Sequence, residues 1–254
     1  MHVADIAAIG PDPIAKGRYR VRMAQSQADV LECQRLRCRA FGLSPNPDGG
    51  ESDAFDTRCN HFLISDQTNA QVVATFRTLH LRNSADVLGS YSAQSYDLSN
   101  LSKYPGPLLE LGRFCLDPLR ADPDILRVAW AALTRMVDDL GITLLFGCSS
   151  FAGLDPAPHL RSFAKLRTRA VGPDQWRPAR KAAQVLEFTD VADDAPASGS
   201  APLPSLLRSY LVMGGWVSDH AVYDHQMGTM HVFTAVEIDA IPETRKRLLR
   251  AAAQ

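Results

Sequence analysis

Two charged residues, Glu110 and Arg113, lie three positions apart inside the apolar stretch 108–115. A carboxylate can take a proton and a guanidinium can bind an anion, so the pair is a candidate for acid–base chemistry. The stretch is apolar on both faces and follows Pro105-Gly106-Pro107, which is typical of a buried strand. Charges in such a strand either form a structural ion pair or serve a site. A bulge at Gly112 would turn both side chains toward one cleft.

Five residues earlier in the chain extend this set. Each of these five residues is a weak signal alone. Together with Glu110 and Arg113, they form one set of charged and aromatic residues with a characteristic order and spacing along the chain. They are Arg37, Phe41, Asp53, Asp56 and Arg77.

Other reactive residue types do not predict a site. None of the five cysteines lies in a Cys-x-x-Cys pair, which argues against structural zinc. Cys115 and Cys148 fall in apolar segments and are expected to be structural. His220, Asp224, His225 and His231 lack a recognised ligand spacing, so no metal is expected, and His220 to His225 are expected to lie in a loop. Ser149 and Ser150 lack the Gly-x-Ser-x-Gly frame of serine hydrolases.

The composition is that of a soluble globular protein, with 46% hydrophobic and 22% charged residues among 254. The net charge of −1 argues against nucleic acid as a partner. No secretory signal is visible and no apolar run approaches the roughly 18 residues of a membrane span, so we expect a cytoplasmic protein.

Basic residues gather between His159 and Lys181, where the only acid is Asp174. Such a run is either a solvated face or a surface for an acidic partner or an anionic membrane. Its members include Arg161, Lys165, Arg167 and Arg169.

The elements that must position these residues predict an α/β fold with a mixed sheet flanked by helices. After a lead-in over 1–17, we expect a single domain over 18–254, with a polar loop at 193–204 and a C-terminal extension after it. The clearest helix begins at Asp122-Pro123 and ends at Gly141. Strands on either side of it suggest a parallel crossover connection. Expected strands are 18–24, 61–65, 71–79, 108–115, 142–148, 185–188 and 229–238, and expected helices are 29–41, 122–140, 156–167 and 206–214.

Three longer motifs give these residues a context: Glu110-Leu-Gly-Arg-Phe-Cys115, the segment 145–156 (LFGCSSFAGLDP) and the segment 206–220 (LLRSYLVMGGWVSDH). With them, the sequence over roughly 18–245 resembles the acyl-homoserine-lactone (autoinducer) synthases. It resembles still more the L-ornithine N-alpha-acyltransferases of ornithine-lipid synthesis, sometimes called hemolysin-like proteins. Both belong to the GNAT-like acyltransferases, so a GNAT-like, autoinducer-synthase-like sheet is implied.

Two departures qualify the resemblance. The autoinducer synthases carry a tryptophan a few residues beyond the counterpart of Phe41, whereas this chain reads Leu43-Ser-Pro-Asn-Pro47, which argues against their adenine-containing co-substrate. Enzymes that use acetyl-CoA bind its pyrophosphate with a glycine-rich loop at a helix N-terminus. Here the corresponding turn, 119–124, has no glycine, a proline and two acids. A donor linked to a carrier protein, with a single phosphodiester, fits this turn better.

The resemblance implies a role for each residue. Glu110 would take the proton of the acceptor amine, with Arg113 as its catalytic neighbour or brace. Asp53 and Asp56 would hold the acceptor's cationic groups, and Arg77 or Arg113 would pair with its carboxylate; Arg37 and Phe41 complete the substrate site. The basic residues Arg161, Lys165, Arg167 and Arg169 would dock the acidic carrier protein.

The implied reaction transfers a 3-hydroxy fatty acyl group from acyl carrier protein to the α-amine of L-ornithine, giving lyso-ornithine lipid. No cofactor is implied beyond the phosphopantetheine thioester of the carrier, and the lipid product implies peripheral contact with the inner membrane. The alternatives are an autoinducer-type or other amino-acid N-acyltransferase, and a non-catalytic module that binds the carrier protein.

Overall fold

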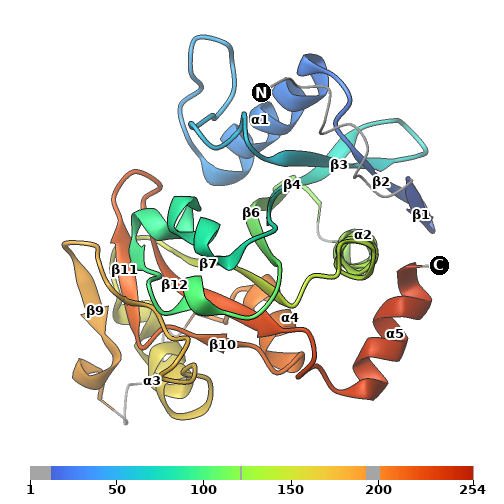
Figure 1. The fold of residues 1–254 in the computed structure, drawn as a ribbon. Helices are drawn as coiled ribbons and strands as arrows, with labels where there is room; N and C mark the ends of the chain where they lie inside the picture. Colours follow the sequence, from blue (N-terminus) through green and yellow to red (C-terminus); the bar gives the residue numbers. More distant parts are fainter. Residues whose placement is uncertain (1–12, 121, 193–200, 254) are drawn as a thin grey trace. The chain divides into compact units, whose positions relative to one another are not determined.

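The computed structural model describes residues 13–120, 122–192 and 201–253, which divide into two compact units (Figure 1). Unit 1 comprises Met1–His80, Leu111–Ile142 and Glu243–Gln254, and unit 2 comprises Leu81–Glu110 and Thr143–Pro242. Most of the expected lead-in and most of the expected 193–204 loop lie outside the described residues.

Unit 1 is built on strands in the order β1-β2-β3-β4-β6. The pairs β1/β2, β2/β3 and β3/β4 are antiparallel. In Figure 1, α1 and α2 are drawn on opposite sides of β3, and α2 also packs against the C-terminal helix α5. The elements of unit 1 are β1 (Ile14–Lys16), β2 (Tyr19–Met23), α1 (Gln27–Phe41), β3 (Asn60–Asp66), β4 (Val72–Leu81), the later part of β6 (Leu108–Leu116), α2 (Pro123–Leu140) and α5 (Glu243–Ala253).

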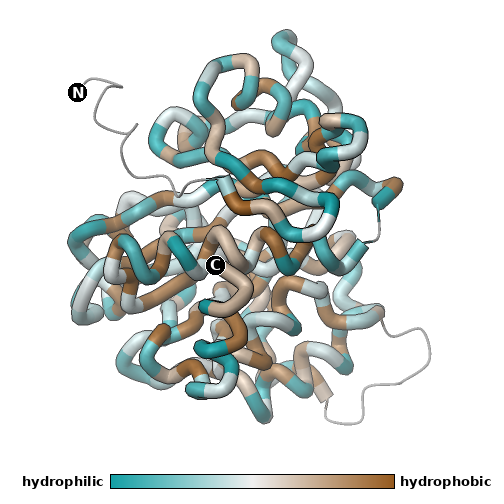
Figure 2. The backbone as a smooth tube through the Cα atoms, turned by 90° about the vertical axis from the view of Figure 1, so that its right-hand side faces the viewer, coloured by the Kyte–Doolittle hydropathy of each residue, from teal (hydrophilic) through white to brown (hydrophobic). Residues whose placement is uncertain are grey.

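Helix α2 follows from its cap residues and its apolar stripe. The Asp122 side chain accepts the Asp124 N–H at 2.9 Å, Pro123 starts the helix, and Gly141 ends it in the left-handed conformation, with φ 61°. The stripe that includes Val128 and Leu133 is fully buried, and each such side chain contributes roughly 1.5–3 kcal/mol of transfer free energy. Hydrophobic and hydrophilic residues alternate along the helical turns in Figure 2, as amphipathic helices require.

Strand β6 runs through the boundary between the units, because Glu110 belongs to unit 2 and Leu111 to unit 1. The expected strand is confirmed over Leu108–Leu116. Within the strand, Arg113, next to Gly112, has φ 51°; the bulge expected at Gly112 stays a prediction. A left-handed conformation at a residue other than glycine is strained and is found more often at functional sites than elsewhere.

Unit 2 continues from the first residues of β6 in the order β6-β7-β12-β11-β9, with β10 beside β12. A cluster of buried apolar side chains from β7, β12 and the helices α3 and α4 forms its core, and Phe151, Phe163 and Val232 are among its fully buried members. The elements of unit 2 are β5 (Tyr96–Asp97), β7 (Leu144–Ala152), α3 (Leu160–Arg169), β8 (Ala179–Arg180), β9 (Val185–Glu187), α4 (Ser205–Val212), β10 (Trp216–Val217), β11 (His220–Asp224) and β12 (Thr229–Glu237).

Several expectations need correction. The loop expected over His220 to His225 is wrong for its first five residues, because His220–Asp224 form β11, where His220 is fully buried. The helix expected from residue 156 begins as the short 3-10 turn Ala157–His159 and becomes α-helical only at Leu160. The expected helices and strands do not include α5 or the 3-10 turns Ser84–Gly89, Ser92–Gln94 and Leu101–Lys103. The short 3-10 turns have no clear apolar period.

None of the helices among the described residues combines the length and apolar character needed to cross a bilayer.

Candidate functional site

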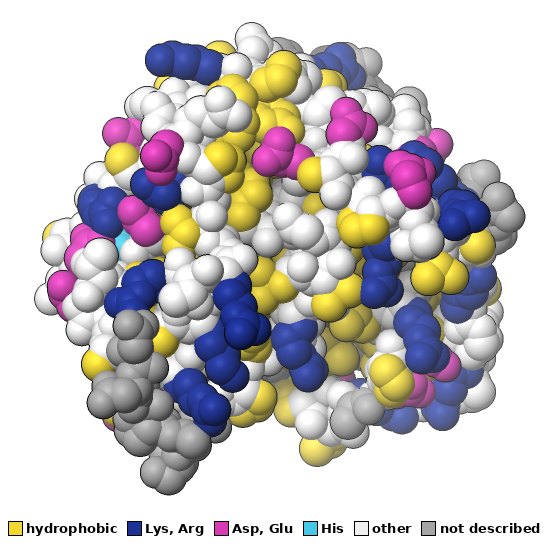
Figure 3. All heavy atoms as spheres, turned by 90° about the horizontal axis from the view of Figure 1, so that it is seen from below, with side chains coloured by type: hydrophobic (Ala, Val, Ile, Leu, Met, Phe, Trp, Pro, Cys, Tyr) yellow, Lys and Arg dark blue, Asp and Glu magenta, His cyan; other side chains and the backbone are white. Residues whose placement is uncertain are grey.

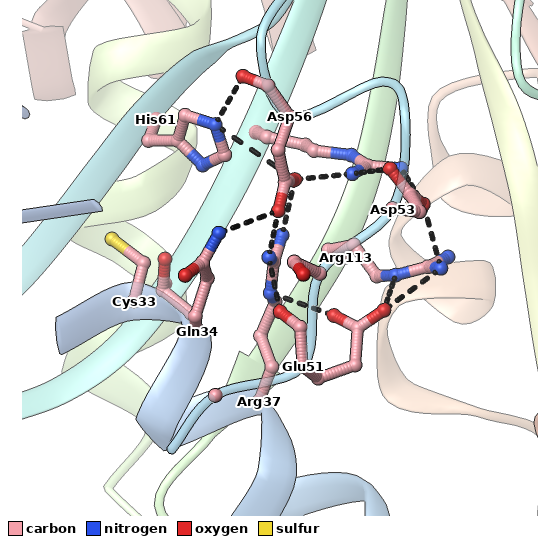
Figure 4. Close-up of polar contacts among 12 residues, drawn as sticks. Cys33, Gln34, Arg37, Glu51, Asp53, Asp56, His61 and Arg113 are labelled. Atoms are coloured by element: carbon pink, nitrogen blue, oxygen red, sulfur yellow. Dashed lines mark hydrogen bonds and ion pairs between the residues drawn. The ribbon is translucent and has the colours of Figure 1, made fainter. Parts of the chain in front are cut away.

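Five of the seven predicted catalytic and substrate-binding residues meet in unit 1, in the cluster of ion pairs shown in Figure 4. The cluster contains three guanidinium groups, three carboxylates and two neutral polar side chains. We call it the arginine–acid cluster; it consists of Gln34, Arg37, Glu51, Asp53, Asp56, His61, Arg77 and Arg113.

Arg37 forms the buried base of the cluster and is 1% exposed. Its Nη1 donates to Asp56 Oδ1 at 2.9 Å and its Nη2 donates to the Glu51 carbonyl at 2.6 Å. Its Nε lies 2.8 Å from Glu51 Oε2, an ion pair whose orientation falls short of a hydrogen bond. Gln34, one turn earlier on α1, donates to the other oxygen of Asp56 at 2.9 Å.

Arg77 and Arg113 bind the remaining acid oxygens. Arg77 donates to both oxygens of Asp53, at 2.6 and 2.7 Å, and also to Asp56. Arg113 donates from Nη2 to Asp53 Oδ2 at 2.9 Å and from Nε to Glu51 Oε1 at 3.1 Å. Asp53 therefore bridges two guanidinium groups from neighbouring strands, in the bidentate geometry that carboxylates and guanidinium groups favour.

Local sequence explains how the acids reach the arginines. A side chain at Gly50 would place its Cβ 2.5 Å from the Cβ of Gln34, so only glycine lets the chain pass this close to α1. The next residue, Glu51, donates its N–H to the Gln34 carbonyl at 3.0 Å. Asp53 caps the following turn by accepting the Phe55 N–H at 2.9 Å.

The strand register brings two further members together, because His61 on β3 is paired directly with Arg77 on β4. Burial lowers the pKa of His61, which favours the neutral ring. Its Nε2 lies 2.9 Å from the Asp56 carbonyl, so the ring donates there.

The electrostatics of the cluster favour ionised acids. Burial opposes ionisation of Asp56, but the hydrogen bond and charge of Arg37 and the charge of Arg77 outweigh it and hold its pKa well below the usual range. The pKa of Asp53 is lowered in the same way, against burial, chiefly by Arg77 and then by Arg113. Asp53 is the most exposed of the three acids, with 17% of its side chain accessible.

Phe41 lies at the C-terminal end of α1, which stops at Gly42 in the left-handed conformation, φ 65°. It is half-buried and packs against the apolar cluster that contains Cys33, Leu36 and Cys115. Burial raises the pKa of the Cys115 thiol to about 12, so it is inert at neutral pH.

Glu110 lies in unit 2, is 4% exposed and has a different kind of surrounding. Its Oε2 accepts the backbone N–H of Tyr91 at 3.0 Å. Its Oε1 accepts both the N–H of Ser92 at 2.7 Å and the Ser92 hydroxyl at 2.6 Å. Three neutral donors from one turn therefore orient this carboxylate.

The four basic residues predicted to dock a carrier protein lie on α3, but they are not equivalent. Arg161, Lys165 and Arg169 are exposed. Arg167 is half-buried and donates to the carbonyls of Phe188 and Val191 at 2.8 and 2.6 Å, so it holds the following segment in place. Lysine and arginine side chains are grouped on the face seen in Figure 3, which views the side of Figure 1 where α3 is drawn.

The turn before α2 is occupied by the protein's own carboxylates. Asp122 accepts the Asp124 N–H, as described above, and also the Tyr19 hydroxyl at 2.8 Å. Asp117 accepts the Leu119 N–H at 3.0 Å. Pro123 has no N–H, so among the described residues of this turn the N–H groups of Leu119 and Asp124 are already bonded to carboxylates and Pro123 offers none to a pyrophosphate.

The structure adds polar residues that were not predicted for the site: Gln34, Glu51 and His61 in unit 1, and Tyr91 and Ser92 in unit 2. Glu51 directly precedes the predicted acids, and a glycine pair before it marks a close chain approach, so its sequence signal was present. Tyr91 contributes a backbone N–H, which the sequence does not reveal. The described residues include no group of three or more His, Cys, Asp or Glu side chains arranged to hold a metal ion.

Comparison with known proteins places these features in a family context. Residues 36–131 match the acetyltransferase (GNAT) domain model. The chain is 31% identical over 245 residues to an L-ornithine N(alpha)-acyltransferase of Brucella abortus (strain 2308), covering 89% of this chain and 86% of that protein. A protein of the same name from Rhodobacter capsulatus is 30% identical over 243 residues, covering 90% of this chain and 93% of that protein.

Among solved structures, an N-acyl amino acid synthase from uncultured soil microbes has a similar fold, with a TM-score of 0.51 at 9% sequence identity. The superposition covers 88% of this chain and 94% of that one. The predicted α/β class, a GNAT-like mixed sheet flanked by helices, is confirmed.

Proposed function

The chain belongs to the L-ornithine N(alpha)-acyltransferase family and is an acyltransferase that N-acylates an amino acid; on that premise we propose that it moves a 3-hydroxy fatty acyl group from acyl carrier protein to the α-amine of L-ornithine. The observation that carries this proposal is the similarity to relatives of that name over about nine tenths of the chain. The product would be lyso-ornithine lipid, and its acyl chain would bring the enzyme into peripheral contact with a membrane.

The reaction needs one proton acceptor and no covalent intermediate, because a thioester is already activated. The α-ammonium of ornithine gives a proton to Glu110, and the free amine attacks the thioester carbonyl. The tetrahedral intermediate then collapses and the C–S bond breaks. The carrier's thiolate leaves and takes up the second proton, which the attacking nitrogen loses as the amide forms, and Glu110 releases its proton to solvent. Burial of Glu110 among fixed donors supports this role, since a positioned carboxylate is what the step requires.

We place the acceptor's cationic groups against Asp53, with Arg113 or Arg77 pairing with its carboxylate. Asp53 is the most accessible acid of the arginine–acid cluster, and its two arginine partners already present guanidinium groups beside it. Arg37 and Asp56, the most deeply buried arginine and the most deeply buried acid of the cluster, would hold Asp53 and Arg77 in position. Phe41 would support the cluster from the end of α1.

The donor proposal is supported by the turn before α2. The N–H groups of Leu119 and Asp124 are capped by Asp117 and Asp122, and a pyrophosphate would meet these carboxylates. The single phosphodiester of a carrier-linked phosphopantetheine needs fewer donors there. For docking of the acidic carrier we propose Arg161, Lys165 and Arg169, with Arg167 fixing the helix that presents them.

Purified protein, 3-hydroxypalmitoyl acyl carrier protein and a panel of amino acids test the proposal, with products identified by mass spectrometry. We expect N-acyl-ornithine as the main product. Faster acylation of lysine, serine or glycine would contradict the acceptor assignment. Equal rates with 3-hydroxypalmitoyl-CoA would contradict the donor assignment. A non-catalytic binding module would give no product, and its carrier binding would survive Glu110→Ala.

A further inference from the structure

The turn that holds Glu110 contains a buried hydroxyl with a defined orientation. Ser92 is fully buried, and both its N–H and its hydroxyl donate to the same oxygen, Glu110 Oε1. A hydroxyl has one hydrogen, so this donation fixes the direction of the Ser92 O–H bond. Hydrogen bonds to an ionised carboxylate are about twice as strong as those between neutral groups.

A second contact, made by Cys148, supports the same orientation of the Ser92 hydroxyl. Cys148 on β7 donates its S–H to Ser92 Oγ, at 3.5 Å between the heavy atoms. The hydroxyl therefore accepts on one side and donates on the other, and such chains of hydrogen bonds polarise one another. Cys148, Ser92 and Glu110 thus form one directed chain that ends at the carboxylate.

The turn itself is anchored independently of Glu110. Ser90 Oγ accepts the Ala93 N–H at 3.3 Å, and the Lys181 ammonium donates to the Ala93 carbonyl. The Ala182 N–H binds the Ser95 carbonyl at 3.0 Å. Because the following chain is held at these points, Ser92 resists movement when the charge on Glu110 changes.

We propose that Ser92 is a positioning residue for proton transfer, which holds Glu110 in one rotamer and stabilises its ionised form. The proposal rests on the proposed role of Glu110 as proton acceptor. When the carboxylate takes the substrate proton, the hydroxyl of Ser92 turns and accepts from the new O–H, so the pair stays hydrogen-bonded in both states. No bond to Ser92 forms or breaks in the reaction.

Among the described interactions, the Cys148 thiol on β7 and the Lys181 ammonium beside β8 contact this turn. The Tyr96 phenol on β5, which interacts electrostatically with Cys148, is hydrogen-bonded to His231. Burial raises the pKa of Tyr96 far above its usual value, so the phenol stays neutral at the pH of the assay.

The test is the pH dependence of kcat/KM for Ser92→Ala, measured with the carrier-linked donor and ornithine. Losing a donor to the ionised form makes the carboxylate harder to ionise, so the acidic limb of the profile should move to higher pH by about one unit. We expect kcat near neutral pH to fall about 10-fold, with little change in the KM for ornithine. Ser92→Thr, which keeps the hydroxyl, should restore the position of the limb.

Ser90→Ala is the matched control, because it removes a buried hydroxyl from the same turn whose described bond is to Ala93 rather than to Glu110. The acidic limb of the kcat/KM profile of Ser90→Ala should lie at the same pH as that of the natural protein. Cys148→Ala removes the S–H donated to Ser92, so a shift of the same sign and smaller size is expected. If Ser92→Ala does not fold, Ser92→Cys, with its weaker donor, should shift the limb in the same direction.

An unmoved limb in Ser92→Ala, or equal shifts in Ser92→Ala and Ser90→Ala, would overturn the positioning role. That result differs from failure of the proposed function, which would appear in the natural protein as absent ornithine acylation or in Glu110→Gln as unchanged turnover.

Discussion

The acids of the arginine–acid cluster and the acid Glu110 are both buried, but they are stabilised by different partners. Glu51, Asp53 and Asp56 contact guanidinium groups at 2.5 to 3.1 Å. Glu110 accepts hydrogen bonds from two backbone N–H groups and one hydroxyl. Both kinds of partner favour the ionised acid, but guanidinium groups also bring positive charge, whereas the described donors to Glu110 orient it without adding charge.

The two kinds of surrounding favour two different roles, acceptor binding and proton transfer, for residues that the sequence presents as one set of charges. The cluster suits the binding of a charged acceptor and the stability of unit 1, because it is charge-balanced and buried. Glu110 takes the proton in the proposed reaction.

The largest effect is expected for Glu110→Gln, which keeps the shape of the side chain and removes its charge. Loss of a general base typically costs about 10²- to 10⁴-fold in rate, so kcat should fall by about that factor. Circular dichroism and thermal unfolding serve as controls for the fold. A decrease in kcat of less than about 3-fold would argue against the assigned role.

Arg37→Met should affect stability first. The substitution leaves Asp56 and Glu51 buried without their main partner, and breaking a buried ion pair on one side typically costs about 3–5 kcal/mol. Urea denaturation measures the free energy of unfolding.

Arg37→Met combined with Asp56→Asn provides the control for that change. The double variant should recover part of the loss, because the orphaned charge is removed with its partner. If the loss of unfolding free energy in the double variant equals the sum of the losses in Arg37→Met and Asp56→Asn, the two residues are not coupled, which would contradict the ion pair.

Unit 2 should be sensitive to mild acid through His231. Burial lowers its pKa to about 4, below the value of about 6.5 in an unfolded chain. The unfolded chain therefore takes up the proton first, and stability is lost as the pH falls from about 6.5 to about 4, by about 3 kcal/mol at most. Denaturation at several pH values across this range measures the free energy of unfolding, which should depend less on pH in His231→Gln than in the natural protein.

The acids of the arginine–acid cluster should respond in a different pH range from buried histidines. The pKa values of Asp53 and Asp56 are lowered by folding, so their contribution is present above about pH 4 and is lost only as the pH falls further. We therefore expect the Asp56→Asn variant and the natural protein to lose the same amount of unfolding free energy as the pH falls to about 5.

The smallest effect is expected at α3. Reversing Arg161 and Lys165 to Glu should raise the KM for acyl carrier protein about 10-fold and weaken its salt dependence, because exposed charges act mainly on encounter. Arg39→Glu, an exposed charge reversal on α1, is the matched control and should leave this KM unchanged. A change in kcat without a change in KM would argue against docking.

Much of the fold was predictable where local signals agree. Asp122-Pro123 and Gly141 mark both ends of α2 because capping and glycine conformation act over single residues. Strand β6 was predictable from its continuous apolar run. The segment from 81 to 104 was not, because its short 3-10 turns follow tertiary contacts rather than an apolar period.

The candidate site was predictable in its residue types but not in its grouping. The sequence indicates that Asp53, Asp56 and Arg77 belong together, and the structure pairs them. It does not reveal that the described partners of Glu110 are a turn at Tyr91 and Ser92, since backbone N–H groups leave no mark in a sequence. The left-handed backbone at Arg113 was also unpredictable, because residues other than glycine rarely adopt it and nothing in the local sequence marks it.

The most direct test of the account is the single-turnover rate of ornithine acylation by Glu110→Gln and by the natural protein from about pH 7 to about pH 10. Ornithine's amine loses its proton to solvent in the upper part of this range, so a base on the enzyme becomes unnecessary. We predict that the rate deficit of Glu110→Gln shrinks steadily as the pH rises. A deficit that stays constant across the range would contradict proton transfer to Glu110 and would assign it only to holding the turn at Tyr91 and Ser92.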